Sequence, residues 1–308
     1  MIKSIKIGTR SSKLALYQSN LVKEKLSNLS PSIKISLVEI KTKGDKIQDR
    51  NLNRSIDKGF FVKEIQEHLL DDQIDIAVHS LKDLPVENYS DDITSVILKR
   101  GNHSDVFLSR DKKKLVDFDH SLRIGTSSLR RKAQLLNINS NLKIDDVRGN
   151  VDTRISKMLK GEYDGLVMAA AGIERLGLKE YITDYFDTEQ MLPAPGQGAI
   201  SVEFKKKNNE LFDILKNLND DETSLCTYLE RSFMNELGGG CNSPIGAYSF
   251  ISNKKKKITG SILSLDGRQL YKQSLEEDIN NDINIGKLLA EDLIKSGADK
   301  IIKNLTVE

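Results

Sequence analysis

A strand–turn–helix pattern that occurs twice in the chain constrains the fold more than any other feature. The first copy is an alternating apolar segment at 2–8, followed by a threonine, serines and an amphipathic segment at 12–27. The second copy is the segment 124–128, with a glycine, a threonine and two serines before another helical pattern. Strands that alternate with helices are typical of parallel sheets covered by helices. The repeat therefore predicts two related α/β lobes.

Each lobe then adds a strand, a helix and a further strand. The expected ranges are 33–41, 60–70 and 74–79 in the first lobe, and 143–147, 152–159 and 164–168 in the second. Ligands on such sheets lie outside the carboxyl ends of the strands. The residues that follow these strands are therefore the first place to look for a site.

Two crossings are expected between the lobes, a polar segment at 99–104 and a proline-containing segment at 192–198. Because the chain leaves the first lobe, builds the second and returns, we expect a cleft with a hinge. From about Asp221 the pattern changes to a helix, a cysteine loop and short strands, with an exposed hairpin tip at the lysine run 254–257. The predicted fold class is α/β, with two lobes and a small α+β C-terminal domain. The expected domains are 1–98 with 197–216, 103–192, and 220–308.

Composition narrows the class of protein. The 308 residues include 38% apolar and 30% charged side chains, which is typical of a globular chain. The net charge of +2 gives no support for nucleic-acid binding. No apolar run approaches the roughly 18 residues of a membrane span, and the first residues form a strand pattern rather than a signal peptide. With two cysteines there is no disulfide framework, so we expect a cytoplasmic protein without a membrane or nucleic-acid partner.

A cysteine lies in a glycine loop at 237–244. The preceding segment, 221–237, has apolar residues at helical spacing, and a glycine directly after it is a C-cap signal. Three consecutive glycines remove side-chain bulk beside Cys241. The loop therefore holds the thiol where a large group can approach it. The alternative is that Cys241 is a small buried side chain after a capped helix.

Arginines and hydroxyls follow the predicted strands. Helix N-termini and arginine forks both suit anions, so the set predicts a ligand with several carboxylates or phosphates. Surface salt bridges are the alternative for each arginine taken singly. The arginines are Arg10, Arg130, Arg131, Arg148, Arg154 and Arg175.

Asp83 is the candidate acid. It follows a strand, stands next to Lys82 and precedes Pro85. A carboxylate there can accept protons or stabilise a developing cation, or it can serve as a helix N-cap or a surface partner of Lys82. Beside it lies His79, which together with Cys241 would be needed by a cysteine hydrolase. The histidines show no metal-ligand spacing, so no metal site is expected.

Six motifs stand out together. They read Val78-His79-Ser80-Leu81-Lys82-Asp83-Leu84-Pro85, Ile124-Gly125-Thr126-Ser127-Ser128-Leu129-Arg130-Arg131, Val147-Arg148-Gly149-Asn150-Val151-Asp152-Thr153-Arg154, Ala171-Gly172-Ile173-Glu174-Arg175-Leu176-Gly177, Pro193-Ala194-Pro195-Gly196-Gln197-Gly198-Ala199 and Gly239-Gly240-Cys241. In this order, and over most of the chain, they resemble the porphobilinogen deaminase family, also called hydroxymethylbilane synthase.

The resemblance implies an activity and a cofactor. Members of this family are transferases that join four porphobilinogen molecules head to tail, lose ammonia each time and release hydroxymethylbilane by hydrolysis, for heme and other tetrapyrroles. They grow the product on a dipyrromethane primer held by a thioether, and Cys241 occupies the attachment position. Asp83 would contact pyrrole N–H groups and stabilise cationic intermediates. A carboxylate among cations stays ionised, as that role requires.

The resemblance also assigns the binding positions. The cofactor-binding residues would be Cys241, Lys82, Asp83, Thr126, Ser127, Ser128, Arg130, Arg131 and Arg148. The substrate-binding residues would be Arg10, Ser12, Lys58, Arg148, Arg154 and Arg175. The implied fold is a monomer with two lobes like those of the periplasmic binding proteins and a third domain that carries the cysteine.

One segment departs from the family pattern. Ser55-Ile56-Asp57-Lys58-Gly59 stands where the family often has a glycine-rich run, in a segment that resembles the mobile flap over the active site. We expect 49–59 to be poorly ordered without substrate, while Lys58 keeps its place. Two alternatives stay open: a two-lobed anion-binding or sensor protein without catalysis, and the cysteine hydrolase.

Overall fold

The computed structural model describes residues 2–40, 59–86, 89–117, 122–240 and 242–305. The chain divides into two compact units, Met1–Gly101 with Ala199–Ser224, and Asn102–Gly198 with Leu225–Glu308. The predicted boundaries of the three domains stay predictions. None of the helices in the described part of the chain is both long and apolar enough to cross a bilayer.

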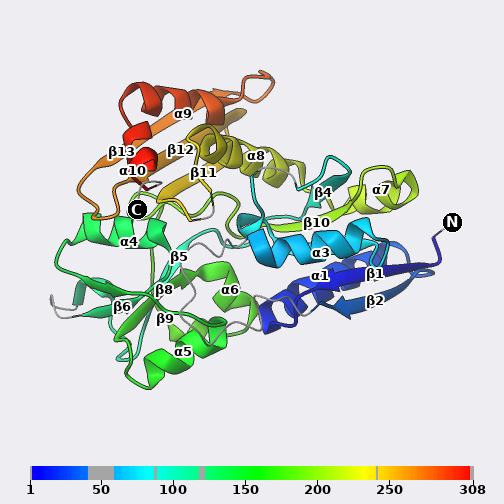
Figure 1. Ribbon diagram of the computed structural model, residues 1–308, viewed down its shortest axis with the longest axis horizontal. Coiled ribbons are helices and arrows are strands. Elements are labelled where there is room, and N and C mark those ends of the chain that lie inside the picture. The colour runs from blue at the N-terminus through cyan, green and yellow to red at the C-terminus, as the bar shows by residue number, and fades with distance from the viewer. Residues whose placement is uncertain (1, 41–58, 87–88, 118–121, 241, 306–308) are drawn as a thin grey trace. The chain divides into compact units, whose positions relative to one another are not determined.

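The first unit contains a five-stranded sheet in the order β2-β1-β3-β10-β4 (Figure 1). The strands are β1 (Ser4–Thr9), β2 (Lys34–Glu39), β3 (Ile76–Ser80), β4 (Ile93–Ile97) and β10 (Ile200–Lys205). β1 pairs parallel with β2 and β3, whereas β10 is antiparallel to both of its neighbours. The predicted β-α-β-α-β pattern is confirmed, with one inserted strand that comes from after the second crossing.

Helices cover both faces of this sheet. α1 (Lys13–Leu29) packs Val22 and Leu26 on one face, against Ile76 and Val202. α3 (Gly59–Leu70) packs Ile65 and Leu69 against Ala77. Because successive side chains in a strand alternate between faces, Ile76 and Ala77 face opposite helices. The short elements are η1 (Leu81–Asp83), α7 (Asn209–Leu215) and η4 (Lys216–Leu218).

The second unit repeats this strand arrangement in the order β7-β6-β8-β5-β9. The strands are β5 (Asp105–Ser109), β6 (Arg123–Gly125), β7 (Lys143–Asp145), β8 (Gly165–Ala169) and β9 (Ile182–Tyr185). Its antiparallel strand is β5, which follows the first crossing just as β10 follows the second. The shared order supports the two related lobes predicted from the repeat.

Three helices cover the second sheet, with short 3₁₀ turns at its margins. α5 packs Ile155 and Met158 against Leu166 on one face, while Leu135 of α4 packs with Val167 and Phe107 on the other. The elements are α4 (Leu129–Ile138), α5 (Val151–Leu159), α6 (Ala170–Arg175), η2 (Leu115–Asp117) and η3 (Lys179–Tyr181).

The C-terminal part has a separate antiparallel sheet in the order β11-β12-β13. Its elements are α8 (Asp221–Glu236), β11 (Ile245–Ser252), β12 (Lys255–Leu263), β13 (Leu270–Asp278), α9 (Ile285–Lys295) and α10 (Asp299–Leu305). Phe233 of α8 lies so close to Gly260 of β12 that a Cβ on that glycine would be 2.4 Å from the ring. The predicted small α+β domain is therefore present.

The lysine run 254–257 was predicted to be an exposed hairpin tip, and the structure differs from this prediction. Asn253 and Lys254 form the turn, with positive φ values of 52° and 59°. Lys256 is already inside β12, is 3% exposed and donates a hydrogen bond to the Asn281 carbonyl. Side chains alternate between the faces of a strand, so Lys255 and Lys257 point the other way, toward Glu276 of β13. One lysine of the run is thus part of the interior.

A substitution at Gly286 tests the packing of α9 on α8. A Cβ at this position would lie 2.0 Å from the backbone oxygen of Leu229, which is fixed in a helix. We expect Gly286→Ala to lower the free energy of unfolding by about 1–3 kcal/mol, as overpacking does. Thermal unfolding measures the change. Gly240→Ala is the control because its Cβ would meet no described atom within 4 Å. Equal melting temperatures for the two variants would contradict the close packing.

Candidate functional site

Asp83 lies in a short turn that two buried leucines hold in place. β3 ends at Ser80, and η1 carries Lys82 and Asp83, both half-buried, between Leu81 and Leu84. The two leucines pack in one apolar cluster with Ala199, and the backbone N–H of Leu81 donates to the Ala199 carbonyl at 3.0 Å. The backbone of the η1 turn is therefore held in place by this apolar cluster. Ser80, rather than Asp83, stands at the N-cap position of η1.

Arg10 and Ser12 follow the neighbouring strand. β1 pairs directly with β3, so their carboxyl ends lie at one edge of the first sheet. Ser12 caps α1, since its Oγ accepts from the backbone N–H of Ala15 at 3.3 Å. A side-chain hydrogen bond of 2.7 Å from Gln18 to Ser80 ties α1 to the end of β3. Four predicted site residues of the first unit thus share one sheet edge.

The predicted hydroxyl residues of the second unit form the turn between β6 and α4. Thr126 is buried, and its backbone N–H donates to the Asp145 carbonyl at 2.9 Å. Ser128 caps α4. The hydroxyl of the exposed Ser127 donates to the Val147 carbonyl at 2.5 Å, which joins this turn to the loop before α5. That loop carries Arg148, so hydroxyls and arginine are brought together as predicted.

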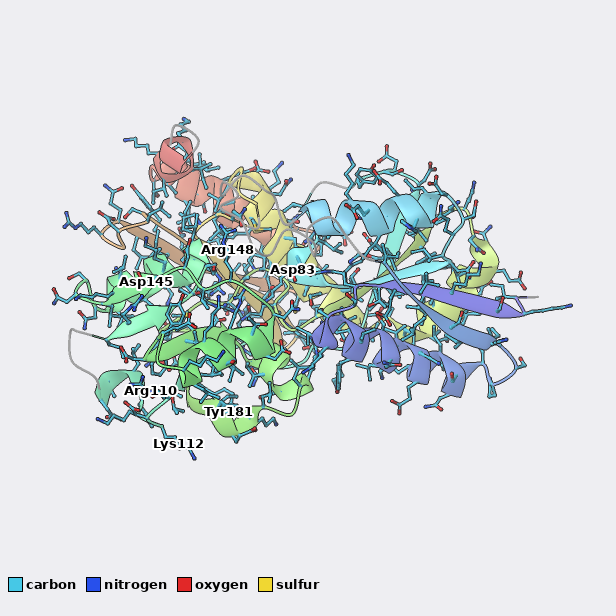
Figure 2. All side chains as sticks on the ribbon, turned by 60° about the horizontal axis from the view of Figure 1, so that its bottom comes forward. Asp83, Arg110, Lys112, Asp145, Arg148 and Tyr181 are labelled. Atoms are coloured by element: carbon cyan, nitrogen blue, oxygen red, sulfur yellow. The ribbon has the colours of Figure 1, made fainter. Side chains whose placement is uncertain are left out.

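Arg148 lies in the loop before α5, and Arg154 lies in the first turns of that helix. Arg148 is exposed; Figure 2 labels it on the second unit and Asp83 on the first. Arg154 donates from Nε to the Gly149 carbonyl at 2.7 Å, within the same loop. Gly149 has φ of 111°, and a Cβ there would lie 2.7 Å from Thr153, so the loop needs a glycine. The arginine fork is therefore attached to the loop's own backbone.

Arg175 contacts the second crossing. It lies in the last turn of α6 and donates from Nη2 to the Gly198 carbonyl at 2.6 Å. Gly198 itself has a φ of 92°. The sequence pattern placed Arg175 among the arginines at strand ends and helix starts, whereas it lies at the end of α6. Its contact with Gly198 was not predicted, because the two residues belong to separate motifs.

The two adjacent arginines of α4 share a buried partner that sequence analysis missed. Arg130 is 3% exposed and donates from Nη1 to Oδ2 of Asp105 at 2.6 Å and to the Leu192 carbonyl at 2.6 Å. Arg131 is 7% exposed, and its Nη2 lies 2.7 Å from Oδ1 of Asp105. Both guanidinium groups therefore lie on a single carboxylate, at the first residue of β5.

Gln197 completes this cluster. Its side-chain amide donates to Oδ1 of Asp105 at 3.0 Å and to the His103 carbonyl at 2.8 Å. Its oxygen accepts from Nη2 of Arg131 at 3.4 Å. We call Asp105, Arg130, Arg131 and Gln197 the Asp105 cluster. Asp105 and Gln197 are fully buried and lie beside the two crossings, so the cluster joins the crossing ends to the start of α4.

The cluster shifts the pKa values of Asp105 and Arg130. Burial opposes ionisation of Asp105, but Arg130 and Arg131 outweigh it and hold the pKa of this carboxyl well below its usual range. Burial also lowers the pKa of Arg130, and Arg131 adds to the effect while Asp105 opposes it. An arginine nevertheless stays protonated. All three charges persist at neutral pH.

The cysteine loop is described on both sides of Cys241, which itself lies outside the described residues. Gly238 follows α8 with φ of 72°, which confirms the predicted glycine at the helix end. A Cβ at Gly239 would lie 2.3 Å from Ile245, whereas one at Gly240 would meet no described atom within 4 Å. Lys58 and the proposed flap up to residue 58 also lie outside the described residues.

His79 is placed where a cysteine hydrolase could not use it. The ring is 7% exposed on β3, and Nε2 lies 3.2 Å from Oε2 of Glu203 on β10, although not in hydrogen-bonding geometry. Glu203 accepts two hydrogen bonds from Gln66 of α3. His79 is thus enclosed between the sheet and α3. The cysteine hydrolase alternative therefore lacks the accessible histidine that it would need as a general base.

These arrangements define the class of protein. It is a two-lobed α/β protein with arginines and hydroxyls at strand ends, an arrangement that suits the binding of a ligand with several acidic groups. The chain matches the family description "Porphobilinogen deaminase, dipyromethane cofactor binding domain" over residues 5–213, and "Porphobilinogen deaminase, C-terminal domain" over 224–295. The chain belongs to the porphobilinogen deaminase family. The resemblance inferred from the motifs is confirmed, together with the fold class, the transferase activity and the dipyrromethane cofactor that it implied.

Curated relatives match over their full length. The porphobilinogen deaminase of Alkaliphilus metalliredigens is 39% identical, with 100% of this chain and 97% of that protein covered. That of Staphylococcus carnosus is 40% identical over 100% of both chains. Among solved structures, the LysR-family transcriptional regulator CbnR gives a TM-score of 0.44 at 12% identity, with 71% of this chain and 70% of that chain covered.

The pH dependence of stability tests the buried carboxylate. Because the pKa of Asp105 is lower in the folded chain, its charge stabilises the fold above the unfolded pKa of about 3.9, and this stabilisation is lost as the pH falls below that value. Removing the carboxylate from a buried ion cluster costs about 3–5 kcal/mol. We therefore expect Asp105→Asn to lower the melting temperature equally between about pH 5 and 8, with a shrinking difference below about pH 4. A difference that varies strongly around neutrality would contradict this.

Proposed function

We propose that this chain is a hydroxymethylbilane synthase. It joins four porphobilinogen molecules head to tail on a dipyrromethane primer, with loss of ammonia at each addition, and releases hydroxymethylbilane by hydrolysis. The observation that carries the proposal is the family match over both parts of the chain. A cytoplasmic location and a monomeric state accompany the proposal as predictions.

The residues of the second unit fit an acidic cofactor. Each pyrrole of a dipyrromethane carries an acetate and a propionate, so its side chains need cations and hydroxyls. Two arginines on one aspartate give the Asp105 cluster an excess of positive charge. Nε of Arg130 is buried and has no hydrogen-bond partner in the part of the chain described here. An N–H group of this kind suits an anionic oxygen.

The residues proposed to hold the cofactor divide by unit. Thr126, Ser127, Ser128, Arg130, Arg131 and Arg148 would serve in the second unit, and Lys82 and Asp83 in the first. Arg10, Ser12, Arg154, Arg175 and Lys58, again with Arg148, would bind the carboxylates of incoming porphobilinogen. Cys241 would carry the thioether. Arg131 already uses much of its fork on Asp105, Val167 and Gln197, so it would contribute mainly charge.

Asp83 is proposed as the catalytic carboxylate. When bound, the dipyrromethane supplies the pyrrole carbon to which the next unit is joined. Asp83 would accept hydrogen bonds from pyrrole N–H groups and stabilise positive charge that develops as ammonia leaves. The buried Leu81 and Leu84, on either side of Lys82 and Asp83, support this role because they fix the backbone that carries the carboxylate before any ligand binds.

The mass of the intact protein tests the proposed cofactor attachment. We expect the mass to exceed that of the sequence by two pyrrole units, and the protein to colour with an aldehyde reagent for dipyrroles. Cys241→Ser should abolish both, because the thioether needs the sulfur. Cys226→Ser is the matched control, since Cys226 is a buried cysteine of α8, outside the glycine loop. An unmodified protein would instead favour the anion-binding sensor without catalysis.

Asp83→Asn tests the catalytic carboxylate. We expect the variant to keep its cofactor mass while kcat falls by about 100-fold or more, the range found when one electrostatic contact to a transition state is lost. Asp91→Asn, at an exposed aspartate of the same unit, should leave kcat unchanged. A normal rate in Asp83→Asn would remove this residue from the mechanism.

A further inference from the structure

Two basic side chains and one acid make up the buried charge of the Asp105 cluster. Oδ2 of Asp105 accepts from Arg130, and Oδ1 accepts from Arg131 and from Gln197. The charges that act most strongly on Arg130 are those of Asp105 and Arg131. One carboxylate cannot balance two guanidinium groups. The cluster therefore keeps one unit of positive charge in excess, in surroundings that screen it weakly.

The same contacts fix the direction of each guanidinium. Nη1 of Arg130 donates to Asp105 and to the Leu192 carbonyl. Arg131 donates from Nε to Asp105 and from Nη1 to the Val167 carbonyl at 3.2 Å. Asp105 is the acceptor that both arginines share, and it is the first residue of a buried strand. Without it, two like charges would face each other inside the protein.

We propose that Asp105 is a positioning residue for the acidic ligand of this family. It holds Arg130 and Arg131 together in one orientation and cancels only one of their charges, so that a ligand carboxylate supplies the second counter-charge. Asp105 does this through the arginines and touches no ligand itself. The identity of the ligand, the dipyrromethane, rests on the proposed function. The excess of positive charge in the cluster does not depend on it.

Two structural features separate this role from ordinary buried packing. The unpartnered Nε–H of Arg130 is left over after Asp105 and Leu192 have been satisfied, so the pair retains a donor for a further acceptor. The pair also lies in the first turn of α4, whose helix dipole adds to the positive potential. A neutral cluster with every donor paired would offer an anionic ligand neither charge nor a hydrogen bond.

The test compares stability with and without cofactor. Asp105→Asn is made in the full chain and in the Cys241→Ser chain, which cannot carry the thioether. We expect Asp105→Asn to lower the melting temperature more in the Cys241→Ser chain, because a cofactor carboxylate partly replaces the missing charge. Equal losses in both backgrounds would overturn the proposal. Asp145→Asn is the matched control: Asp145 pairs with the exposed Arg123 at 2.9 Å, and its two losses should be small and equal.

Arg130→Gln should change the stabilisation by cofactor in the direction opposite to Asp105→Asn. This variant tests the proposal if Asp105→Asn does not fold. It leaves a neutral Arg131–Asp105 pair, so the melting-temperature gain from cofactor should shrink relative to the unsubstituted chain. A gain that stays the same would overturn the proposal. Asp105→Glu keeps the charge, so the difference between the two backgrounds that Asp105→Asn shows should be smaller or absent with Asp105→Glu.

A citrate titration separates failure of this inference from failure of the proposed function. Citrate, compared with chloride at equal ionic strength, should raise the melting temperature of the Cys241→Ser chain. The increase should be larger with Asp105→Asn and absent with Arg130→Gln. If the full chain carries no pyrrole mass but citrate behaves in this way, the proposed function fails and the positioning role stands. If citrate has no greater effect than chloride in any variant, the positioning role fails.

Discussion

The second unit depends on the balance of charge around one buried carboxylate. Asp105 has no exposed surface, and two guanidinium groups hold it ionised. Burying three charges is expensive, and replacing such a cluster with apolar side chains often makes a protein more stable. The Asp105 cluster, with its excess positive charge, therefore destabilises the fold relative to an apolar replacement. The loss of stability is understandable if an acidic ligand later binds at the cluster, because the arginines are then already oriented and lose little freedom on binding.

The crossings contribute to the site because each leads into a central strand. β5 follows the first crossing and β10 the second, and each lies between two neighbours in its sheet. The last two residues of the second crossing and the residue that follows it each bond to a neighbour within their own unit. Gln197 bonds to Asp105, Gly198 accepts from Arg175, and Ala199 accepts from the backbone of Leu81 beside Asp83. Gly198 has a positive φ and carries the carbonyl to which Arg175 donates, so a change of its backbone angles would move that acceptor. The second crossing thus supplies hydrogen-bond acceptors to Arg131 and Arg175 in addition to connecting the units.

The lobes could be predicted from sequence because local signals specify them. Alternating apolar residues indicate strands, and the predicted serines between strand and helix include Ser12 and Ser128, which cap α1 and α4 through their own side chains. The inserted strands β5 and β10 were not predicted, because a short apolar run does not reveal which sheet it joins. The partners of Arg130 and Arg131 were missed for a related reason. Asp105 is far from them in sequence, and its contact exists only once the first crossing has brought β5 beside β8.

Differences in burial among the arginines fit a division of roles under the proposed function. A primer that stays bound through every turnover needs cations that never rearrange, and Arg130 and Arg131 are held by Asp105 inside the protein. Incoming and departing units need cations that can follow a changing chain of carboxylates, and Arg148 is exposed on its loop. An enzyme whose arginines were all buried would bind its primer well but resist elongation. One whose arginines were all exposed would spend binding energy on ordering side chains at each step. The observed mixture meets both requirements.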